Sequence, residues 1–152
     1  MDWKIKRLEE LTIHELYEIL RVRAEVFVVE QTCVYQDLDL KDQHAYHLFC
    51  EKDGEICAYL RILDKGVSYS EIAIGRVLIR ENARHQGLAR EMMEKAIMFI
   101  RDDLNEKIIR ISAQEYLKKF YESFGFRAVS DVYLEDGIPH VEMVWGGFVE
   151  GL

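Results

Sequence analysis

The chain has 152 residues, the size of one ordinary domain, which allows roughly 70% of the unfolded chain's surface to be buried on folding. Hydrophobic residues make up 49% and charged residues 32%, a globular composition, and no apolar run approaches the roughly 20 residues of a membrane helix. The formal net charge of -8 disfavours nucleic acids and anionic membranes as partners, so any phosphate ligand must be held by a local site.

The start of the chain, "MDWKIKRLEE", has no apolar segment behind its charges, so we expect no secretory signal and a cytoplasmic location. The cysteines, Cys33, Cys50 and Cys57, are odd in number and form no C-x-x-C pair. They therefore predict neither a disulfide framework nor a zinc site, and we expect them to be small core residues.

The first half of the chain predicts a strand, a helix and a hairpin. Alternating residues predict a strand over 3–8, and Thr12 with Glu15 forms a capping box for a helix. Apolar residues at helical spacing extend this helix to about Gln31. The polar stretch 32–44 predicts a loop, and residues 45–63 predict a hairpin around Asp53-Gly54, a pair typical of type I′ turns.

The second half of the chain alternates strands with helices. We expect strands over 72–79 and 107–112, helices over 87–103 and 115–124, and final strands near 126–134 and 140–148. Strands that dominate early and alternate with helices later indicate a mixed α/β sheet with its crossovers in the second half. We therefore expect one domain over residues 1–152.

The turn "ENARHQG" before the helix at 87 has the features of an anion site. Gly75, in the preceding apolar strand, predicts a bulge or a close approach to its backbone. Unpaired N–H groups at a helix start attract anions, Gly87 and Ala89 leave room, and Arg84 and Arg90 supply charge. A glycine near a helix start and arginines in solvent are the ordinary alternative. Neither of the two common nucleotide-binding glycine motifs is present.

Two segments resemble motifs of the GNAT superfamily of N-acetyltransferases. Arg84-His85-Gln86-Gly87-Leu88-Ala89 resembles its Q/R-x-x-G-x-G/A motif, whose backbone amides hold the pyrophosphate of acetyl-coenzyme A (acetyl-CoA). The segment "AQEYLKKFYESFGF" over 113–126 resembles the family's next motif, but has Gln114 where many members carry Asn. The stretches "LRVRAEVFVVEQ", "YQDLDLKDQH", "GRVLI" and "VYLEDGIPH" resemble the ElaA-like branch, so the likeness covers nearly the whole chain.

The resemblance implies a single GNAT-like α/β domain, with a mostly antiparallel twisted sheet of about seven strands flanked by helices and a parallel pair at the cofactor cleft. It also implies Tyr121 as the general acid for the departing thiolate, since a phenol is protonated at neutral pH. A tyrosine at helical spacing with Phe120 and Phe124 is also an ordinary core residue. The residues that the resemblance assigns to acetyl-CoA are Val77, Leu78 and Ile79 for the thioester, Arg84, His85, Gln86, Gly87, Leu88, Ala89 and Arg90 for the pyrophosphate, and Gln114 and Phe120.

The general base and the acceptor site are less specified. Glu30, Glu71 and His140 are each candidates for the base, directly or through water, and each is also an ordinary surface residue. Arg76, embedded in "AIGRVLI", must face solvent, a cleft or a partner carboxylate, because an unpaired buried charge is costly. We expect a cleft and a role in acceptor binding. The acidic loop "YQDLDLKDQH" either attracts a cationic amine or is solvated.

The function that these features favour is N-acetylation of a primary amine, on a small molecule or a peptide, by direct attack on acetyl-CoA. The alternative is a non-catalytic acetyl-CoA-binding sensor or regulatory module. His14, His44, His47 and His85 show no ligand spacing on one face, so no metal is predicted. We expect no nucleic acid and no membrane partner, and the sequence is compatible with a monomer or a homodimer.

Overall fold

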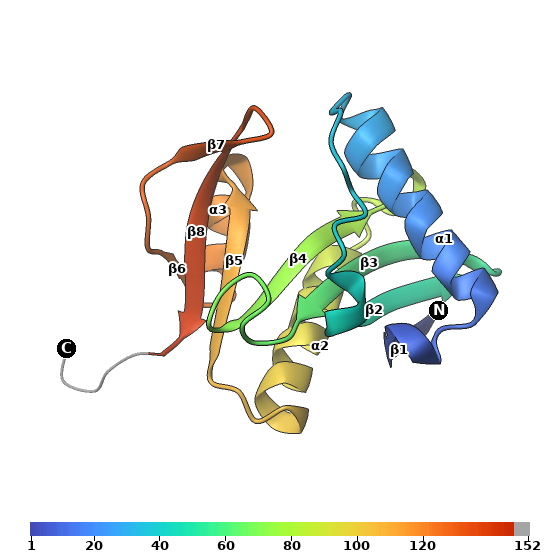
Figure 1. The fold of residues 1–152 in the computed structure, drawn as a ribbon, viewed down its shortest axis with the longest axis horizontal. Helices are drawn as coiled ribbons and strands as arrows, with labels where there is room; N and C mark the ends of the chain where they lie inside the picture. The colour runs from blue at the N-terminus through green and yellow to red at the C-terminus, as the bar shows by residue number, and fades with distance from the viewer. Residues whose placement is uncertain (148–152) are drawn as a thin grey trace.

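The computed structural model describes residues 1–147, which form one eight-stranded sheet flanked by helices (Figure 1). The strands are β1 (Asp2–Arg7), β2 (Ala45–Lys52), β3 (Glu55–Leu63), β4 (Ile72–Ile79), β5 (Ile108–Gln114), β6 (Phe126–Ala128), β7 (Tyr133–Glu135) and β8 (Ile138–Gly146). Their order is β1-β2-β3-β4-β5-β8-β6, and β7 also pairs with β8. Within these residues β4 and β5 pair in parallel and the other pairs are antiparallel, which confirms the expected mixed fold with one additional strand.

Two long helices cover opposite faces of the sheet, as the ribbon shows (Figure 1). They are α1 (Ile13–Arg23) and α2 (Leu88–Met98), and the short α3 (Lys118–Glu122) precedes β6. The predicted ends near Gln31 and Asp103 are reached by π-helical segments, Ala24–Glu30 after α1 and Phe99–Asp103 after α2. Short 3₁₀ turns lie at Leu8–Glu10, Asp42–His44, Glu81–Ala83 and Glu115–Leu117.

Two local signals in the first half of the chain are confirmed. The Thr12 hydroxyl accepts a hydrogen bond from the Glu15 amide at 3.0 Å, and the Glu15 carboxylate accepts one from the Thr12 amide at 2.9 Å. This capping box starts α1 at the residue after Thr12. In the turn between β2 and β3, φ is 53° at Asp53 and 79° at Gly54, as a type I′ turn requires.

The sheet separates two apolar cores because its side chains alternate between faces. In β2, Leu48 packs with Met92 of α2, whereas the next residue, Phe49, packs with Ile19 of α1. The core on the α2 side is the larger one and also contains Tyr121 of α3. The two cores fix both long helices against the sheet.

The region after α3 differs from the expected single strand over 126–134. The amide of Glu142 on β8 donates to the Ser130 hydroxyl at 2.9 Å, so a side chain takes the place of a backbone partner there. The ladder is interrupted, and two short strands, β6 and β7, replace one. The last strand starts at Ile138 rather than 140, and residue 148, its predicted end, lies outside the described residues.

All three cysteines are free. Cys50 and Cys57 are buried, as expected, but Cys33 is half-buried beside the cleft described below, so the core prediction is wrong for it. Across residues 1–147, no helix is long and apolar enough to cross a membrane. Over the same range, no group of three or more His, Cys, Asp or Glu side chains could hold a metal ion.

Candidate functional site

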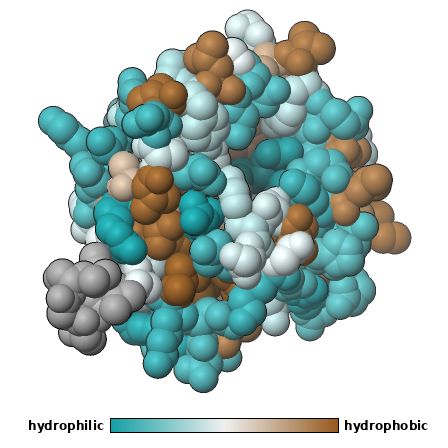
Figure 2. Space-filling model, turned by 60° about the vertical axis from the view of Figure 1, so that its left-hand side comes forward, coloured by the Kyte–Doolittle hydropathy of each residue, from teal (hydrophilic) through white to brown (hydrophobic). Residues whose placement is uncertain are grey.

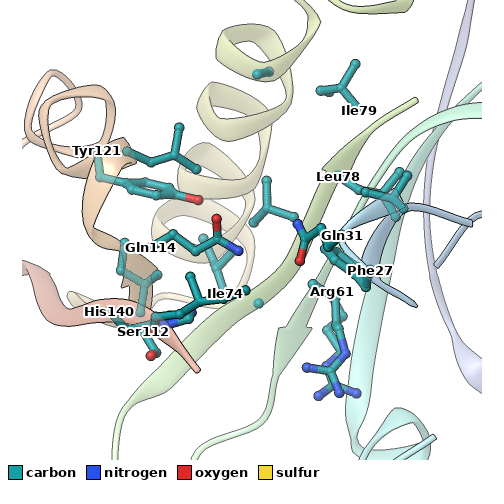
Figure 3. Close-up of a pocket in the computed structure, with 18 of the residues that line it drawn as sticks. Phe27, Gln31, Arg61, Ile74, Leu78, Ile79, Ser112, Gln114, Tyr121 and His140 are labelled. Carbon is teal, nitrogen blue, oxygen red and sulfur yellow. Dashed lines mark hydrogen bonds between the residues drawn. The ribbon is translucent and has the colours of Figure 1, made fainter. Parts of the chain in front are cut away.

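A cleft of about 910 Å³ lies where the two parallel strands separate. β4 and β5 pair only at Ile72 with Ile109 and Ala73 with Arg110, and then diverge. The surface of the molecule is hollowed on this side (Figure 2), and side chains from both strands point into the gap (Figure 3). We call residues 23–42 together with β3 and β4 the N-terminal wall, and β5, α3, β7 and β8 the C-terminal wall.

A β-bulge shapes the N-terminal wall. Arg61 on β3 pairs with Gly75, and Tyr59 pairs with Leu78, so β4 holds one extra residue between these pairs. The bulge expected from Gly75 is therefore confirmed, but Gly75 itself stays in the ladder and Arg76 carries the irregular backbone, with φ of 52°. A Cβ on Gly75 would meet no atom within 4 Å, so the missing side chain leaves open space beside the cleft.

The start of α2 forms one end of the cleft. Gly87 is the N-cap with φ of 79°, a conformation that glycine adopts without strain, and no side chain caps the helix. The first amides of a helix have no partner within the helix, so those of Leu88, Ala89 and Arg90 remain available to a ligand. The predicted pyrophosphate residues from Arg84 to Arg90 line the cleft, with the exception of Gln86.

Arg84 is held by the protein itself. Its guanidinium donates to the Ile79 carbonyl at 2.9 Å and lies 2.7 Å from the Glu30 carboxylate. The hydrogen bond to Glu30 raises the pKa of Arg84 above its ordinary value. Arg84 therefore ties the end of the first helix to the end of β4, next to the start of α2.

Tyr121 of α3 projects into the cleft from the C-terminal wall (Figure 3). Its side chain is buried, with 5% of the residue exposed, and its ring packs edge-on against Phe120 and Phe126. Burial raises the pKa of the phenol, which keeps the hydroxyl protonated at neutral pH. Within residues 1–147 this hydroxyl has no hydrogen-bond partner, and the side-chain amide of Gln114, which also points into the cleft, has none.

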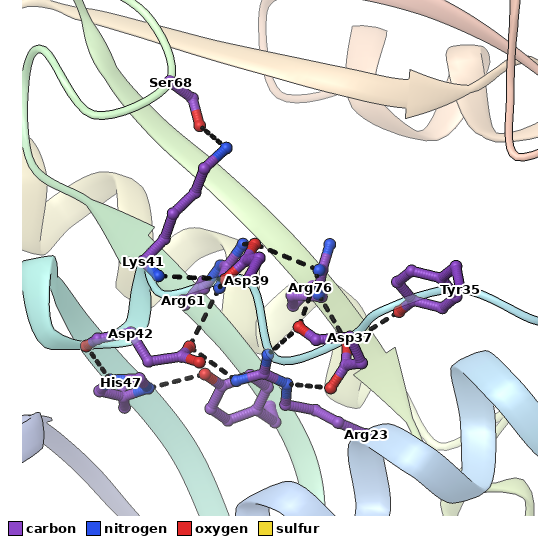
Figure 4. A network of polar contacts seen from close by, with 11 residues as sticks. Arg23, Tyr35, Asp37, Asp39, Lys41, Asp42, His47, Arg61, Ser68 and Arg76 are labelled. Carbon is purple, nitrogen blue, oxygen red and sulfur yellow. Dashed lines mark hydrogen bonds and ion pairs between the residues drawn. The ribbon is translucent and has the colours of Figure 1, made fainter.

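The acidic loop, residues 35–44, is bound by three arginines (Figure 4). Arg23, which is fully buried, lies 3.0 Å from Asp37 and 2.7 Å from Asp42. Arg61 binds Asp39 and Asp42, and Arg76 lies 2.8 Å from Asp37 and 3.3 Å from Asp39. The loop is thus neither simply solvated nor free to bind an amine, because its aspartates are paired. Arg76 combines two of the expected settings, since it faces partner carboxylates and also lines the cleft.

The three candidate bases have different surroundings. Glu30 lines the cleft but is paired with Arg84. Glu71 lies outside the cleft lining and is 3.2 Å from Arg110. His140 is buried, lines the cleft, and its Nδ1 lies 2.7 Å from the Ile138 carbonyl oxygen.

The structure also brings residues into the cleft that the sequence analysis did not select. These residues, from the segment after the first helix, from β5 and from the β7–β8 hairpin, include Gln31, Cys33, Tyr35, Ser112, Glu135 and Asp136. They come from separate parts of the chain and follow no local motif. Ser112 and Glu135 meet only because β5 and β7 both pair with β8, and the sequence contains no signal for that register.

Comparisons with known proteins agree with this geometry. Residues 12–146 match the family model described as an acetyltransferase (GNAT) domain. The chain is 38% identical to protein ElaA of Escherichia coli over 94% of its length and 95% of that protein. The crystal structure of an acyl-CoA N-acyltransferase from Pseudomonas aeruginosa superposes with a TM-score of 0.91 at 41% identity, covering 96% of this chain and all of that one. For the crystal structure of E. coli ElaA the TM-score is 0.89 at 37% identity, over 95% of this chain and 99% of the other. The cleft between diverging parallel strands, the glycine at the start of α2 and these matches lead to one conclusion: the chain belongs to the GNAT acetyltransferase family.

Proposed function

We propose that this protein transfers the acetyl group of acetyl-CoA to a primary amine, on a small molecule or a peptide, by direct attack of the amine. The observation that carries the proposal is that one cleft is lined both by the start of α2 and by the unpartnered Tyr121 hydroxyl. The first is a site for a phosphate, and the second is a proton donor. We propose that residues 1–152 act as a single domain in this reaction.

The pyrophosphate of the cofactor is proposed to bind the backbone amides from Gln86 to Arg90. The positive end of the α2 dipole and the free amides of its first turn favour an anion there. Gly87 leaves the approach open, since a Cβ built on it meets no protein atom within 4 Å. Because Arg84 is paired with Glu30, we assign its contribution to the shape of the turn, with His85, Leu88 and Ala89 as further contacts.

The thioester is proposed to lie along β4 at Val77, Leu78 and Ile79, just after the bulge. A bulge interrupts the ladder, which leaves backbone groups of β4 available to a ligand. Amides that are fixed in place before the reaction can stabilise the oxyanion of the tetrahedral intermediate, an effect of about 3 to 4 kcal/mol in mutated enzymes. Gln114 and Phe120, which line the opposite wall, are proposed to contact the remaining part of the cofactor.

Tyr121 is proposed to protonate the departing thiolate. The phenol holds its proton at neutral pH and can donate it to the sulfur as the carbon–sulfur bond breaks. The absence of a hydrogen-bond partner for this hydroxyl within residues 1–147 supports a role with a ligand rather than with the protein.

Arg76 is proposed to serve the acceptor. It lines the cleft while it anchors Asp37 and Asp39, so it determines where the acidic loop closes the acceptor side. Arg76→Ala should raise the KM for the amine or lower kcat while the affinity for coenzyme A stays near that of the wild type. Loss of cofactor affinity in this variant would assign Arg76 to the cofactor instead.

The experiment that tests the proposed function is a screen of amines and peptides with acetyl-CoA, following the release of free thiol. The proposal expects thiol release that depends on both the amine and the protein. Binding of acetyl-CoA by calorimetry without turnover on any amine, with Tyr121 intact, would favour the alternative of a non-catalytic acetyl-CoA sensor.

A further inference from the structure

The pairing of β5, β7 and β8 places His140 on the opposite face of the sheet from α3. Val141 and Met143 of β8 pack in the large core with Tyr121, so the alternate residue His140 faces the other side. Directly paired residues share a face, and His140 pairs with Gln114 on β5 and with Tyr133 on β7. Tyr121 and His140 therefore reach the same cleft from the two sides of the sheet.

The hydrogen bond at Nδ1 determines which nitrogen of His140 can accept a proton. The partner of Nδ1, the Ile138 carbonyl oxygen at 2.7 Å, can only accept, so Nδ1 carries the hydrogen. In the neutral imidazole the remaining nitrogen, Nε2, then has a free lone pair. A carboxylate oxygen of Glu135 lies 3.6 Å from Nε2, where it would stabilise the ring once Nε2 is protonated.

The rival carboxylates are already engaged. Glu30 lies 2.7 Å from a guanidinium nitrogen of Arg84, which is part of the turn at the start of α2. The hydrogen bond from Arg110 lowers the pKa of Glu71, and Glu71 does not line the cleft. Of the three groups considered as bases, His140 alone lines the cleft without a cationic partner.

We propose that His140 is the general base of the transfer and that Glu135 is a positioning residue for its protonated form. This proposal rests on the proposed function. The amine nitrogen forms a bond to the carbonyl carbon of the thioester and passes its proton to Nε2, and the carbon–sulfur bond breaks as the sulfur takes the proton of Tyr121. Solvent then removes the proton from Nε2 and returns one to the phenolate, so the free amine yields an amide and a thiol.

Other charged and titratable groups surround His140 and enter the design of the test. Tyr133 stacks on the imidazole with ring centroids 6.2 Å apart, and Ser112 donates a hydrogen bond to Glu135 at 3.2 Å. Farther along the same face, Arg110 of β5 binds Glu71 and Glu142. From the remaining elements, Tyr69 and Asp136 also line the cleft. Glu71→Gln is therefore a suitable control, because it breaks the ion pair with Arg110 on the same face of the sheet but outside the cleft lining.

The test compares His140→Gln, Glu135→Gln and Glu71→Gln with the wild type. Each protein is assayed for amine-dependent thiol release, for acetyl-CoA affinity by calorimetry and for thermal unfolding. His140→Gln should lose about 10² to 10⁴-fold in kcat, the range of general base catalysis, with acetyl-CoA affinity within twofold of the wild type. Glu135→Gln should lose about tenfold in kcat with little change in the KM for the amine, and Glu71→Gln should remain as active as the wild type.

Each outcome supports or contradicts the assignment. A folded His140→Gln protein with nearly wild-type kcat overturns it, and so does a large loss of kcat in Glu71→Gln alone. If His140→Gln fails to fold, the test rests on Glu135→Gln, because Glu135 is half-exposed and its substitution should not affect folding. A wild-type kcat in Glu135→Gln would then contradict the assignment of His140 and Glu135. If the wild-type protein binds no acetyl-CoA, or acetylates no amine, the proposed function is wrong. If the wild type is active and His140→Gln is equally active, only the assignment of His140 as the base is wrong.

Discussion

The two walls of the cleft differ in the partners of their most prominent polar side chains. In the N-terminal wall Arg23, Arg61 and Arg76 are each paired with aspartates of the acidic loop. In the C-terminal wall the Tyr121 hydroxyl and the Gln114 amide have no hydrogen-bond partner within residues 1–147. The ion pairs fix the shape of the N-terminal wall, whereas Tyr121 and Gln114 offer polar groups to a ligand in the cleft.

The same difference appears in the ionisable groups. Among residues 1–42, the carboxylates with lowered pKa values are Glu15, Glu18, Asp39 and Asp42. Burial raises the pKa of the Tyr121 phenol in the C-terminal wall, as it does for Tyr35 and Tyr59 in the N-terminal wall, where each phenol ring also lies beside an arginine. Ion pairs therefore stabilise the first half of the chain, whereas the chemistry is expected from the second half. The predictions that follow test this division, beginning with the largest effect.

Removal of the Tyr121 hydroxyl should abolish most of the activity without affecting the fold. Tyr121→Phe keeps the ring and its contacts with Phe120 and Phe126, and no hydrogen bond within residues 1–147 is lost. We expect kcat to fall by about 10² to 10⁴-fold at unchanged melting temperature and cofactor affinity. kcat and thermal unfolding are measured on one preparation, and an active variant would show that Tyr121 is a structural residue.

Removal of the Arg23 charge should lower the stability of the fold. Arg23→Met removes the closest cation of Asp42 and one of the two arginines at Asp37, so the free energy of unfolding should fall by about 3 to 5 kcal/mol. Arg101→Met is the matched control, because the fully exposed pair of Arg101 with Asp102 should contribute little to stability. Chemical denaturation gives both values. Equal stability of the two variants would mean that the acidic loop is not anchored by its buried charges.

The sequence was sufficient for features whose cause is local. The capping box at Thr12, the turn at Asp53-Gly54 and the strand over 72–79 depend on neighbouring residues, and all three are confirmed. The fate of the acidic loop could not be read in this way, since the arginines that bind Asp37, Asp39 and Asp42 come from α1, β3 and β4. The divided strand near Ser130 likewise depends on one hydrogen bond to β8, far along the chain.

In the candidate site, too, the local features were predictable from the sequence and the features that depend on distant residues were not. The turn from Arg84 to Arg90 is one continuous motif, so its place at the cleft was predictable, although Gln86 is not among the residues that line it. The base was not predictable, because what separates Glu30, Glu71 and His140 is the partner that each finds in the fold. Partners from distant segments leave no trace in the local pattern of residues.

Acid should weaken the N-terminal part through Glu15. Burial alone would favour its neutral form, but hydrogen bonds from the Thr12 amide, Lys6 and Lys4 lower the pKa from 4.5 to about 2. A lowered pKa in the folded state stabilises the fold above the unfolded value, and this contribution is lost as the pH falls from about 4.5 through 2. The loss should be on the order of 2 to 3 kcal/mol. Denaturation of the wild type and of Glu15→Gln between pH 6 and pH 3 checks this, and equal pH dependence in both would contradict it.

The smallest expected effect is a loss of coenzyme A affinity on substitution of Gly87, and a matched glycine distinguishes backbone strain from ligand contact. Gly54 and Gly87 both have φ of 79°, and a Cβ on either would meet no protein atom within 4 Å, so alanine should introduce the same strain of about 1 kcal/mol at each. Gly54 lies in the turn between β2 and β3, whereas Gly87 precedes the amides proposed to bind the pyrophosphate. Gly87→Ala should therefore weaken coenzyme A binding at least about tenfold, or 1.4 kcal/mol, while Gly54→Ala leaves it unchanged. Calorimetry on both variants, with melting curves to confirm equal loss of stability, provides the comparison. The two substitutions are matched in φ and in free space, so equal losses of stability with a loss of affinity at Gly87 alone would support a ligand contact there. If both variants bind coenzyme A with the same affinity, the pyrophosphate does not bind at the start of α2.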